Sequence, residues 1–364
     1  MRIEQINELL KLMVDKSASD LHLRVPSPPV LRIDGELIPQ KDLPPVTAKD
    51  VEAAFEHVAT SEQRSAFLRE KDLDFAYSVP GLARFRVSVL RQRGTISLAF
   101  RLVPFEVLSI DDLGLPQILK ELILKPRGLI LVTGPTGSGK STTMAAMIHH
   151  LNENDSRNII TIEDPIEYLH RNRRCIIAQR DLGDDTKSFE AALIHALRHD
   201  PDVIVVGEMR DLATTSTAIR AAETGHLVLG TLHTTDAAQT VDRIIDIFTP
   251  SQQQQIRLQL SQVIEAVLSQ TLLPRIAGGR VAAFEIMVAT SAVRNLIREA
   301  KTFELPNIMR LSSKDGMQTL DEALAGLVRS GIVLQEEAMM KSSNPERLSK
   351  SLQFQYGAST LQRL

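Results

Sequence analysis

The stretch GLILVTGPTGSGKSTTMAAMIHHL, residues 128–151, decides the fold of most of the chain. Residues 128–133 are mostly apolar and predict a buried strand, and the residues from Ser141 onward predict a helix. The turn between them fits G-x-x-x-x-G-K-S/T, a pattern whose glycines let backbone N–H groups wrap phosphates at the positive end of a helix. We therefore expect Lys140 to reach the β- and γ-phosphates of a nucleotide and Ser141 to ligate Mg²⁺.

Three further apolar stretches end in groups suited to phosphoryl transfer. NIITIEDPIE places Glu163 after a strand, PDVIVVGEMRD places Glu208, and HLVLGTLHTTDA places His233, with His226 at the beginning of the same strand. Alternation with helices indicates a parallel sheet covered on both faces, whose strands present their carboxyl ends at one crevice. One carboxylate should serve the metal and the other the attacking water, and the residues alone leave open which does which.

Composition bounds the class of protein. A chain of 364 residues with 43% hydrophobic and 24% charged residues indicates an ordinary globular protein of two domains. The formal net charge of −3 gives no bulk attraction to nucleic acid. Cys175 is the single cysteine, which excludes a disulfide framework and a Cys-based zinc site and favours a buried small apolar role. With no signal-peptide pattern and no apolar run of roughly 20 residues, we expect a cytoplasmic protein.

Residues 1–101 indicate a small mixed α/β unit. Its first residues predict an amphipathic helix, and VLRIDGELI, residues 30–38, predicts a hairpin that turns at Asp34-Gly35. Thr47 and Thr60 each stand three residues before a side chain that can complete a capping box, so each is expected to begin a helix.

The segment RFRVSVLRQRGTISLAFR, residues 84–101, predicts a second hairpin that turns at Arg93-Gly94. This register pairs Val87 with Phe100 on an apolar face and sets Arg86 opposite Arg101 on the polar face. Like charges directly across two strands are destabilising. An anion bound between the two arginines would explain the pairing.

Residues 102–116 contain two prolines and a glycine and predict a linker, which leaves residues 117–364 as a second domain with a helical C-terminal region and a fraying tail. Across such a linker the two arginines could return to their own subunit's nucleotide or reach the nucleotide of a neighbour. The second geometry implies a ring. In the helix predicted at 292–299 one face is apolar, which would leave Arg294 and Arg298 available to a partner.

Four motifs together, GPTGSGKST, TIEDPIE, DVIVVGEMRD and GHLVLGTLHTTDA, resemble the secretion-ATPase superfamily, which drives type IV pili and type II secretion. The resemblance covers nearly the whole chain, because SDLHLR, the 84–101 hairpin and the tail also fit. AVRNLIREAKTFELPNIM, residues 292–309, resembles the C-terminal signature of the retraction branch. Extension ATPases usually carry a longer N-terminal region and a tetracysteine zinc motif, which favours a retraction motor here.

The resemblance implies an α/β protein with a PAS-like N-terminal domain, a RecA-like P-loop ATPase domain and a helical C-terminal tail, assembled as a homohexamer that uses ATP and Mg²⁺. The implied metal ligands are Ser141 and Glu208. The implied nucleotide-binding residues are Gly134, Pro135, Thr136, Gly137, Ser138, Gly139, Lys140, Ser141, Thr142 and His226. The implied catalytic residues are Glu163, Glu208, His233, Arg86 and Arg101.

The function expected from the resemblance is a hexameric ATP-hydrolysing motor for type IV pilus retraction and twitching motility. It would sit in the cytoplasm, peripheral to the inner membrane, and contact pilin indirectly through a polytopic platform protein, with no nucleic acid and no zinc. The alternatives are a type II secretion or pilus-assembly ATPase, and a nucleotide-gated accessory subunit that hydrolyses little. The presence of Lys140, Glu163, Glu208 and His233 argues against the accessory subunit.

Overall fold

The computed structural model describes residues 3–33, 35–104 and 106–360, which form two compact units. The first unit contains residues 1–106 with 167–169, and the second contains residues 107–166 with 170–364. The units divide inside the segment 102–116. The domain bounds 1–101, 102–116 and 117–364 stay a prediction.

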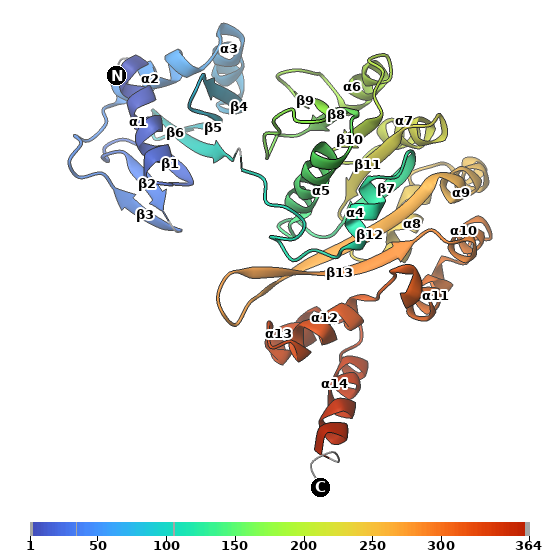
Figure 1. The fold of residues 1–364 in the computed structure, drawn as a ribbon. Coiled ribbons are helices and arrows are strands. Elements are labelled where there is room, and N and C mark those ends of the chain that lie inside the picture. The colour runs from blue at the N-terminus through green and yellow to red at the C-terminus, as the bar shows by residue number, and fades with distance from the viewer. Residues whose placement is uncertain (1–2, 34, 105, 361–364) are drawn as a thin grey trace. The chain divides into compact units, whose positions relative to one another are not determined.

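The first unit is built on an antiparallel sheet with the strand order β3-β2-β1-β6-β5-β4 (Figure 1). Its strands are β1 (Asp20–Leu23), β2 (Val30–Ile33), β3 (Glu36–Pro39), β4 (Asp72–Val79), β5 (Ala83–Gln92) and β6 (Thr95–Val103). Its helices are α1 (Ile3–Asp15), α2 (Ala48–Val58) and α3 (Ser61–Glu70). Helices and sheet share one apolar core, in which Phe67, Phe85 and Phe100 are fully buried.

Both predicted helix starts in this unit are confirmed. Thr47 caps α2 and Thr60 caps α3. In each case the backbone N–H of the threonine donates to the side chain three residues later, which completes a capping box. The hairpin predicted over residues 30–38 forms as the pair of β2 and β3, while Asp34 itself lies outside the described residues.

The second hairpin has the predicted register. β5 and β6 pair with Val87 opposite Phe100 and Arg86 opposite Arg101. Gly94 has φ +82°, which suits the tight turn expected beside it. Alternation of apolar and polar residues was sufficient to predict this register, because a slip by one residue would turn every buried side chain outward.

The second unit contains a larger sheet and most of the helices. Its strands are β7 (Gly128–Thr133), β8 (Asn158–Glu163), β9 (Ile176–Asp181), β10 (Val203–Val206), β11 (Leu227–Leu232), β12 (Ile264–Pro274) and β13 (Arg280–Val288). Its helices up to the end of the sheet are α4 (Ile118–Ile123), α5 (Lys140–Asn154), α6 (Phe189–Ala196), α7 (Leu212–Glu223), α8 (Ala237–Asp246) and α9 (Pro250–Val263). The later helices are α10 (Ser291–Arg298), α11 (Leu305–Leu311), α12 (Leu320–Arg329), α13 (Gln335–Lys341) and α14 (Pro345–Thr360).

The strand order of this sheet is β13-β12-β7-β11-β10-β8-β9. Neighbours from β12 to β9 are parallel, as predicted, but β13 pairs antiparallel with β12. The expectation of an entirely parallel sheet is therefore wrong at this edge. The physical reason is the short connection at 275–279, because a connection of a few residues can join only antiparallel neighbours.

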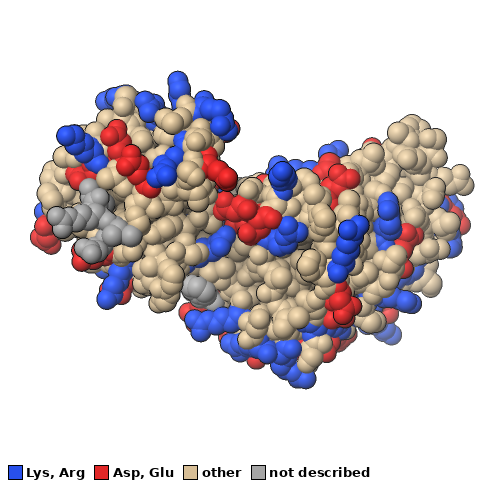
Figure 2. Space-filling model, turned by 90° about the horizontal axis from the view of Figure 1, so that it is seen from above, with Lys and Arg blue, Asp and Glu red and all other residues tan. Residues whose placement is uncertain are grey.

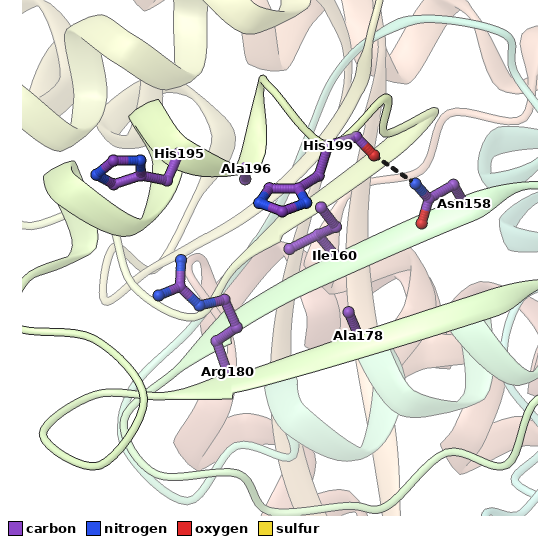
Figure 3. A pocket seen from close by; sticks show the side chains of 7 residues that line it. All are labelled: Asn158, Ile160, Ala178, Arg180, His195, Ala196 and His199. Atoms are coloured by element: carbon purple, nitrogen blue, oxygen red, sulfur yellow. Dashed lines mark hydrogen bonds between the residues drawn. The ribbon is translucent and has the colours of Figure 1, made fainter.

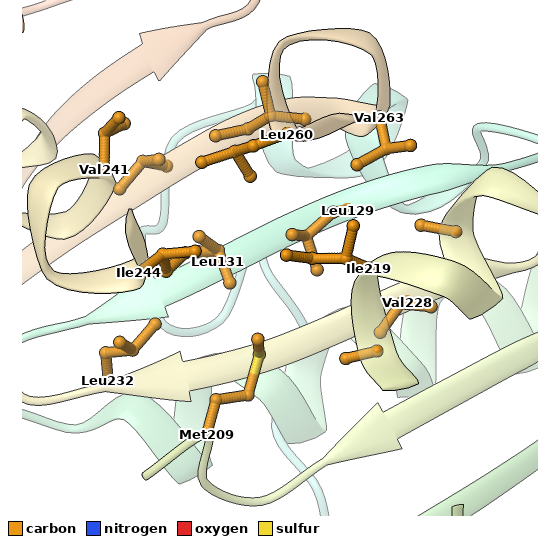
Figure 4. Packing of buried hydrophobic residues seen from close by; sticks show 14 of the residues in the cluster. Leu129, Leu131, Met209, Ile219, Val228, Leu232, Val241, Ile244, Leu260 and Val263 are labelled. Atoms are coloured by element: carbon orange, nitrogen blue, oxygen red, sulfur yellow. The ribbon is translucent and has the colours of Figure 1, made fainter. Parts of the chain in front are cut away.

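Helices cover both faces of the sheet. The helices α4 and α5 pack on one face, where Cys175 is buried as predicted. Figure 4 shows the other face, where apolar side chains of β7 and β11 meet those of α7, α8 and α9. Each fully buried large apolar side chain contributes about 1.5–3 kcal/mol to stability, so this double covering holds β7 rigidly in the middle of the sheet.

The last three helices pack together against the β12–β13 hairpin, beside Leu273, Val281 and Ala283 (Figure 1). Among the described residues, every helix is too short or too polar to cross a bilayer.

Arg294 corrects one expectation about the helix at 292–299. Val293, Leu296 and Ile297 are buried, as predicted, but Arg294 is not available to a partner. Its guanidinium donates to the carbonyl oxygens of Ser261 (2.9 Å), Gln262 (2.8 Å) and Ala289 (3.1 Å) and pairs with Glu265 at 2.7 Å. Arg294 thus ties α10 to the junction of α9 and β12. Arg298 is exposed and donates to Asn295 of its own helix.

We predict that Arg294→Met lowers the free energy of unfolding by about 1–3 kcal/mol, because Glu265 and three carbonyl groups lose a charged donor. The matched change Arg298→Met on the same helix should alter it by less than about 0.5 kcal/mol. Urea denaturation followed by circular dichroism measures both. Equal stabilities of the two variants would show that the Arg294 contacts contribute nothing.

Candidate functional site

The loop from Gly134 to Gly139 joins the end of β7 to the start of α5. Gly134 has φ +139°, and a Cβ there would stand 2.3 Å from the backbone oxygen of Gln270 on β12. Gly137 and Gly139 have φ +78° and +90°. Only glycine adopts these conformations without strain, so the loop has the backbone that its glycine pattern predicts.

Positive groups converge on this loop. The Nζ atom of Lys140 donates to the carbonyl oxygens of Gly134 at 2.7 Å and Pro135 at 3.1 Å. Ser141 and Thr142 follow, half-buried, in the first turn of α5. Pro135, Thr136 and Gly137 are exposed, whereas Ser138 is buried. The ammonium and the helix start together favour an anion beside the loop.

The predicted strand-end residues lie along one edge of the sheet. Glu163 is the last residue of β8, and His233 directly follows β11. Glu208 is the second residue after the end of β10. β10 lies between β8 and β11, with Val206 level with Ile162 and Gly230. The structure brings Glu208 and His233 into direct contact, with Oε1 and Nε2 3.1 Å apart.

Neighbouring groups keep the Glu208 carboxylate ionised. Burial alone would raise the pKa of Glu208, but the hydrogen bond from Arg210 and the charge of His233 outweigh it, so the pKa is lowered. The side chain is only 18% exposed. A fixed negative charge of this kind suits the binding of a metal cation.

Glu163 is oriented by neutral donors. The hydroxyl of Thr161, in the same strand, donates to Glu163 Oε1 at 2.6 Å, and the amide of Gln179 on β9 donates to the same atom at 3.1 Å. Two donors on one oxygen hold the carboxylate in one direction, which is what a group that aligns water requires.

The family model described as Type II/IV secretion system protein matches residues 3–278. The chain belongs to that family. The resemblance drawn from the sequence motifs is therefore confirmed, and with it the predicted α/β class with a small N-terminal unit and a P-loop ATPase unit.

Similar proteins of this family include pilus motors. The chain is 48% identical over 94% of its length to the type IV pilus retraction ATPase PilT of Pseudomonas aeruginosa, of which 99% is covered. It is 46% identical over 88% of its length to a twitching motility protein of Neisseria gonorrhoeae, of which 86% is covered. The crystal structure of the pilus retraction motor PilT with bound ADP matches with a TM-score of 0.88 at 46% identity, covering 96% of this chain and 99% of that one. The protein is thus a P-loop ATPase of the secretion family.

His226 lies away from the other predicted site residues. It directly precedes β11, and its carbonyl oxygen accepts the N–H of Gly128 at the start of β7. Its ring contacts Ala221 and Thr224 at the end of α7. Since the phosphate loop leaves the opposite end of β7, the structure places His226 at the far edge of the sheet. The structure confirms the position predicted for His226, at the beginning of the strand that ends at His233. Its implied role in nucleotide binding stays a prediction.

Arg86 and Arg101 each have a carboxylate partner within the first unit. Arg86 pairs with Asp74 at 3.4 Å, and Arg101 pairs with Asp20 at 2.8 Å. Burial would raise the pKa of Asp20, but hydrogen bonds from Ser19 and Arg101 outweigh it and lower the pKa. These carboxylates relieve the repulsion between the arginines, so the predicted bound anion is not needed to explain the register. The Arg101 side chain still remains 68% exposed.

Gln270 is a site residue that sequence reasoning missed. It is 3% exposed on β12, and its Nε2 donates to the carbonyl oxygen of Ser138 at 2.6 Å. Its Nε2 would also stand 3.1 Å from a Cβ at Gly139. The signal that could have found it is the polar run Ser269-Gln270-Thr271 between the apolar residues of the strand IEAVLSQTLLP.

A pocket of about 470 Å³ lies elsewhere, on the face of β8 and β9 beneath α6. Figure 3 shows Arg180 of β9 pointing toward α6, with His195 and His199 above it and the Asn158 amide bonded to the His199 carbonyl. Both strands stand at the sheet edge remote from β7. This pocket is therefore separate from the phosphate loop.

We predict that Gln270→Leu weakens ADP binding about tenfold, because a buried carbonyl without its donor costs roughly 1–3 kcal/mol and loosens the loop. Titration with a fluorescent ADP analogue measures the affinity. Thr271→Val, at the next position of β12, is the matched control and should bind as the wild type does. Unchanged affinity in Gln270→Leu would show that the loop holds its shape without this side chain.

Proposed function

We propose that the protein retracts type IV pili as a homohexameric ring, in which ATP turnover moves one domain against the other and withdraws pilin from the fibre. The observation that carries the proposal is the 48% identity over 94% of the chain with a pilus retraction ATPase. The phosphate loop and the ionised groups at the neighbouring strand ends support it, because they are the parts that ATP hydrolysis requires.

In the proposed site the phosphates lie along the loop from Gly134 to Thr142. Backbone N–H groups of the loop and of the first turn of α5 would bind the phosphate oxygens, and Lys140 would exchange its loop carbonyl partners for the β- and γ-phosphates. These interactions strengthen as charge moves onto the leaving phosphate, which is how positioning lowers the barrier.

The residues present fit Mg²⁺. Magnesium takes few protein ligands beside phosphate oxygens and water, and prefers oxygen donors. We assign Ser141 and Glu208 to it, the first for its position after Lys140 and the second for its lowered pKa. When bound, the ion would supply charge neutralisation between the β- and γ-phosphates.

The same geometry supports a division of labour among the remaining groups. Glu163, held by Thr161 and Gln179, is assigned to the attacking water. His233, in contact with Glu208, is assigned to sensing the γ-phosphate, because loss of that phosphate would change the charge balance around its ring.

Arg86 and Arg101 are assigned to a neighbouring subunit's nucleotide. The 68% exposure of Arg101 supports this, since its guanidinium can bind a second anion while Nε stays with Asp20. An arginine supplied in trans raises turnover by roughly 10³–10⁵ in other P-loop enzymes.

We further propose a cytoplasmic location at the inner-membrane base of the pilus machine, with a polytopic platform protein as the direct partner and pilin as the indirect one. The proposal includes neither nucleic acid nor zinc. On the face shown in Figure 2, Lys and Arg side chains are interspersed with Asp and Glu.

We predict that Glu163→Gln still binds Mg-ATP but turns over roughly 10²–10⁴-fold more slowly, because the water loses its base. In cells whose only copy is this variant, pili should assemble but fail to retract. Phosphate release, nucleotide binding and imaging of labelled pili are the measurements. Loss of pilus assembly or of secretion, with retraction unaffected, would assign the protein to an assembly or secretion machine instead.

We also predict that Arg101→Ala and Lys140→Ala, each nearly inactive alone, recover activity when their subunits are mixed. Random mixing in a ring leaves about a quarter of the interfaces with an intact loop facing an intact arginine, so roughly that fraction of wild-type turnover should return. Native mass spectrometry confirms subunit exchange.

The control mixes Lys140→Ala with Glu163→Gln. Both changes disable the loop side of the site, so no mixed interface is intact and no activity should return. Recovery confined to the first mixture supports arginine action in trans. No recovery in it, despite proven exchange, means that the arginine acts in its own subunit.

A further inference from the structure

Glu285 stands beside the site without belonging to it. It lies on β13 opposite Ser269 of β12, and Ser269 is in turn paired with Thr133, the last residue before the phosphate loop, their hydroxyl oxygens 2.8 Å apart. Glu285 is therefore level with the edge of the sheet from which the loop leaves. It is half-buried, on the same face as α8.

One helix start held by Glu285 belongs to the segment that carries His233. Glu285 Oε1 accepts the N–H of Ala237, the first residue of α8, at 2.8 Å. Only residues 234–236 separate Ala237 from His233, and Asp236 caps α8 through the N–H of Gln239 at 2.8 Å. Because His233 contacts Glu208 at 3.1 Å, the position of α8 is linked by a short chain to the proposed metal-binding carboxylate.

Glu285 also lies beside the start of α12, the first of the last three helices. The backbone N–H of Leu320, the first residue of α12, interacts with the Glu285 carboxylate closely enough to lower its pKa. Just before it, the backbone of Gln318 forms a two-bond pair with Ile286, at 2.9 and 3.1 Å. The beginning of α12 is thus attached to β13 at the residue next to Glu285.

The surroundings of Glu285 disfavour its charged form. The pKa of Glu285 is raised to about 7, chiefly by burial and further by the nearby charges of Asp236 and Asp321. Only the N–H groups of Ala237 and Leu320 lower it. An uncharged side chain would avoid this cost, so the role of Glu285 is the joint hold on two helix starts.

We propose that Glu285 is a positioning residue that couples the His233 segment to the C-terminal helices, so that a shift of α8 on nucleotide turnover is transmitted to α12. Glu285 does not touch substrate. It acts by fixing the first residue of each helix to one rigid strand. The inference rests on the ATPase activity of the chain and extends the site to residues beyond its motifs.

Two variants test the contact between Glu285 and α12, one by changing Glu285 and the other by changing Leu320. Glu285→Gln keeps the size of the side chain but removes its charge and replaces one acceptor oxygen with an NH₂ donor. Leu320→Pro removes only the N–H on α12, because proline is tolerated at the first position of a helix and Thr319 before it has the extended backbone that proline requires. Gln335→Pro makes the same change at the first position of α13, where Leu334 is also extended and Glu285 is absent, and serves as the control.

The experiment measures kcat and KM for ATP of the assembled protein, and hydrogen exchange of α8 and α12 with ADP and with a non-hydrolysable ATP analogue. We expect both variants to lower kcat about tenfold with KM changed less than about twofold. In the wild type the two nucleotides should give different exchange at the start of α12, and both variants should lose that difference. Gln335→Pro should match the wild type throughout.

Wild-type kcat in both variants would overturn the proposal. A loss in Glu285→Gln together with wild-type behaviour in Leu320→Pro would also overturn it, because Glu285 would then act on α8 alone. If one variant fails to fold, the other decides. A wild-type protein without ATPase activity would instead contradict the activity on which the proposal rests.

Discussion

The contact between the phosphate loop and β12 constrains the rest of the structure. The loop lies against β12 so closely that a Cβ at Gly134 would stand 2.3 Å from the backbone oxygen of Gln270, so only glycine fits at this position. The Gln270 amide then fixes the far side of the loop through the Ser138 carbonyl. Because β12 also pairs with β13, the loop, the sheet edge and the start of the C-terminal helices form one connected unit.

Charge at this edge of the sheet is set by neighbours rather than by residue type. Glu208 and Glu285 are both glutamates that lose water on folding, yet the pKa of the first is lowered and the pKa of the second is raised to about 7. Arg210 and His233 stand beside the first, whereas two aspartates stand near the second. Glutamate is therefore a fixed anion at position 208, whereas at position 285 it has a pKa near neutrality and binds backbone N–H groups.

Local patterns predicted the short-range features well. The capping boxes at Thr47 and Thr60 and the register of the 84–101 hairpin depend on residues close in sequence, and all are confirmed. The partner of Arg101 could not be found in this way, because Asp20 lies 81 residues away and meets it only when β1 joins β6.

The sequence by itself determined the phosphate loop, the strands that carry Glu163, Glu208 and His233, and the family to which the chain belongs. These follow from glycine conformations, from hydrophobic periodicity and from motif spacing, all of which are local. Only the tertiary structure decided that Gln270 supports the loop, that Arg294 serves packing and that Glu285 joins two helix starts. Each of those roles depends on which strands and helices become neighbours, and that choice is made by burial of the whole core rather than by any short stretch of residues.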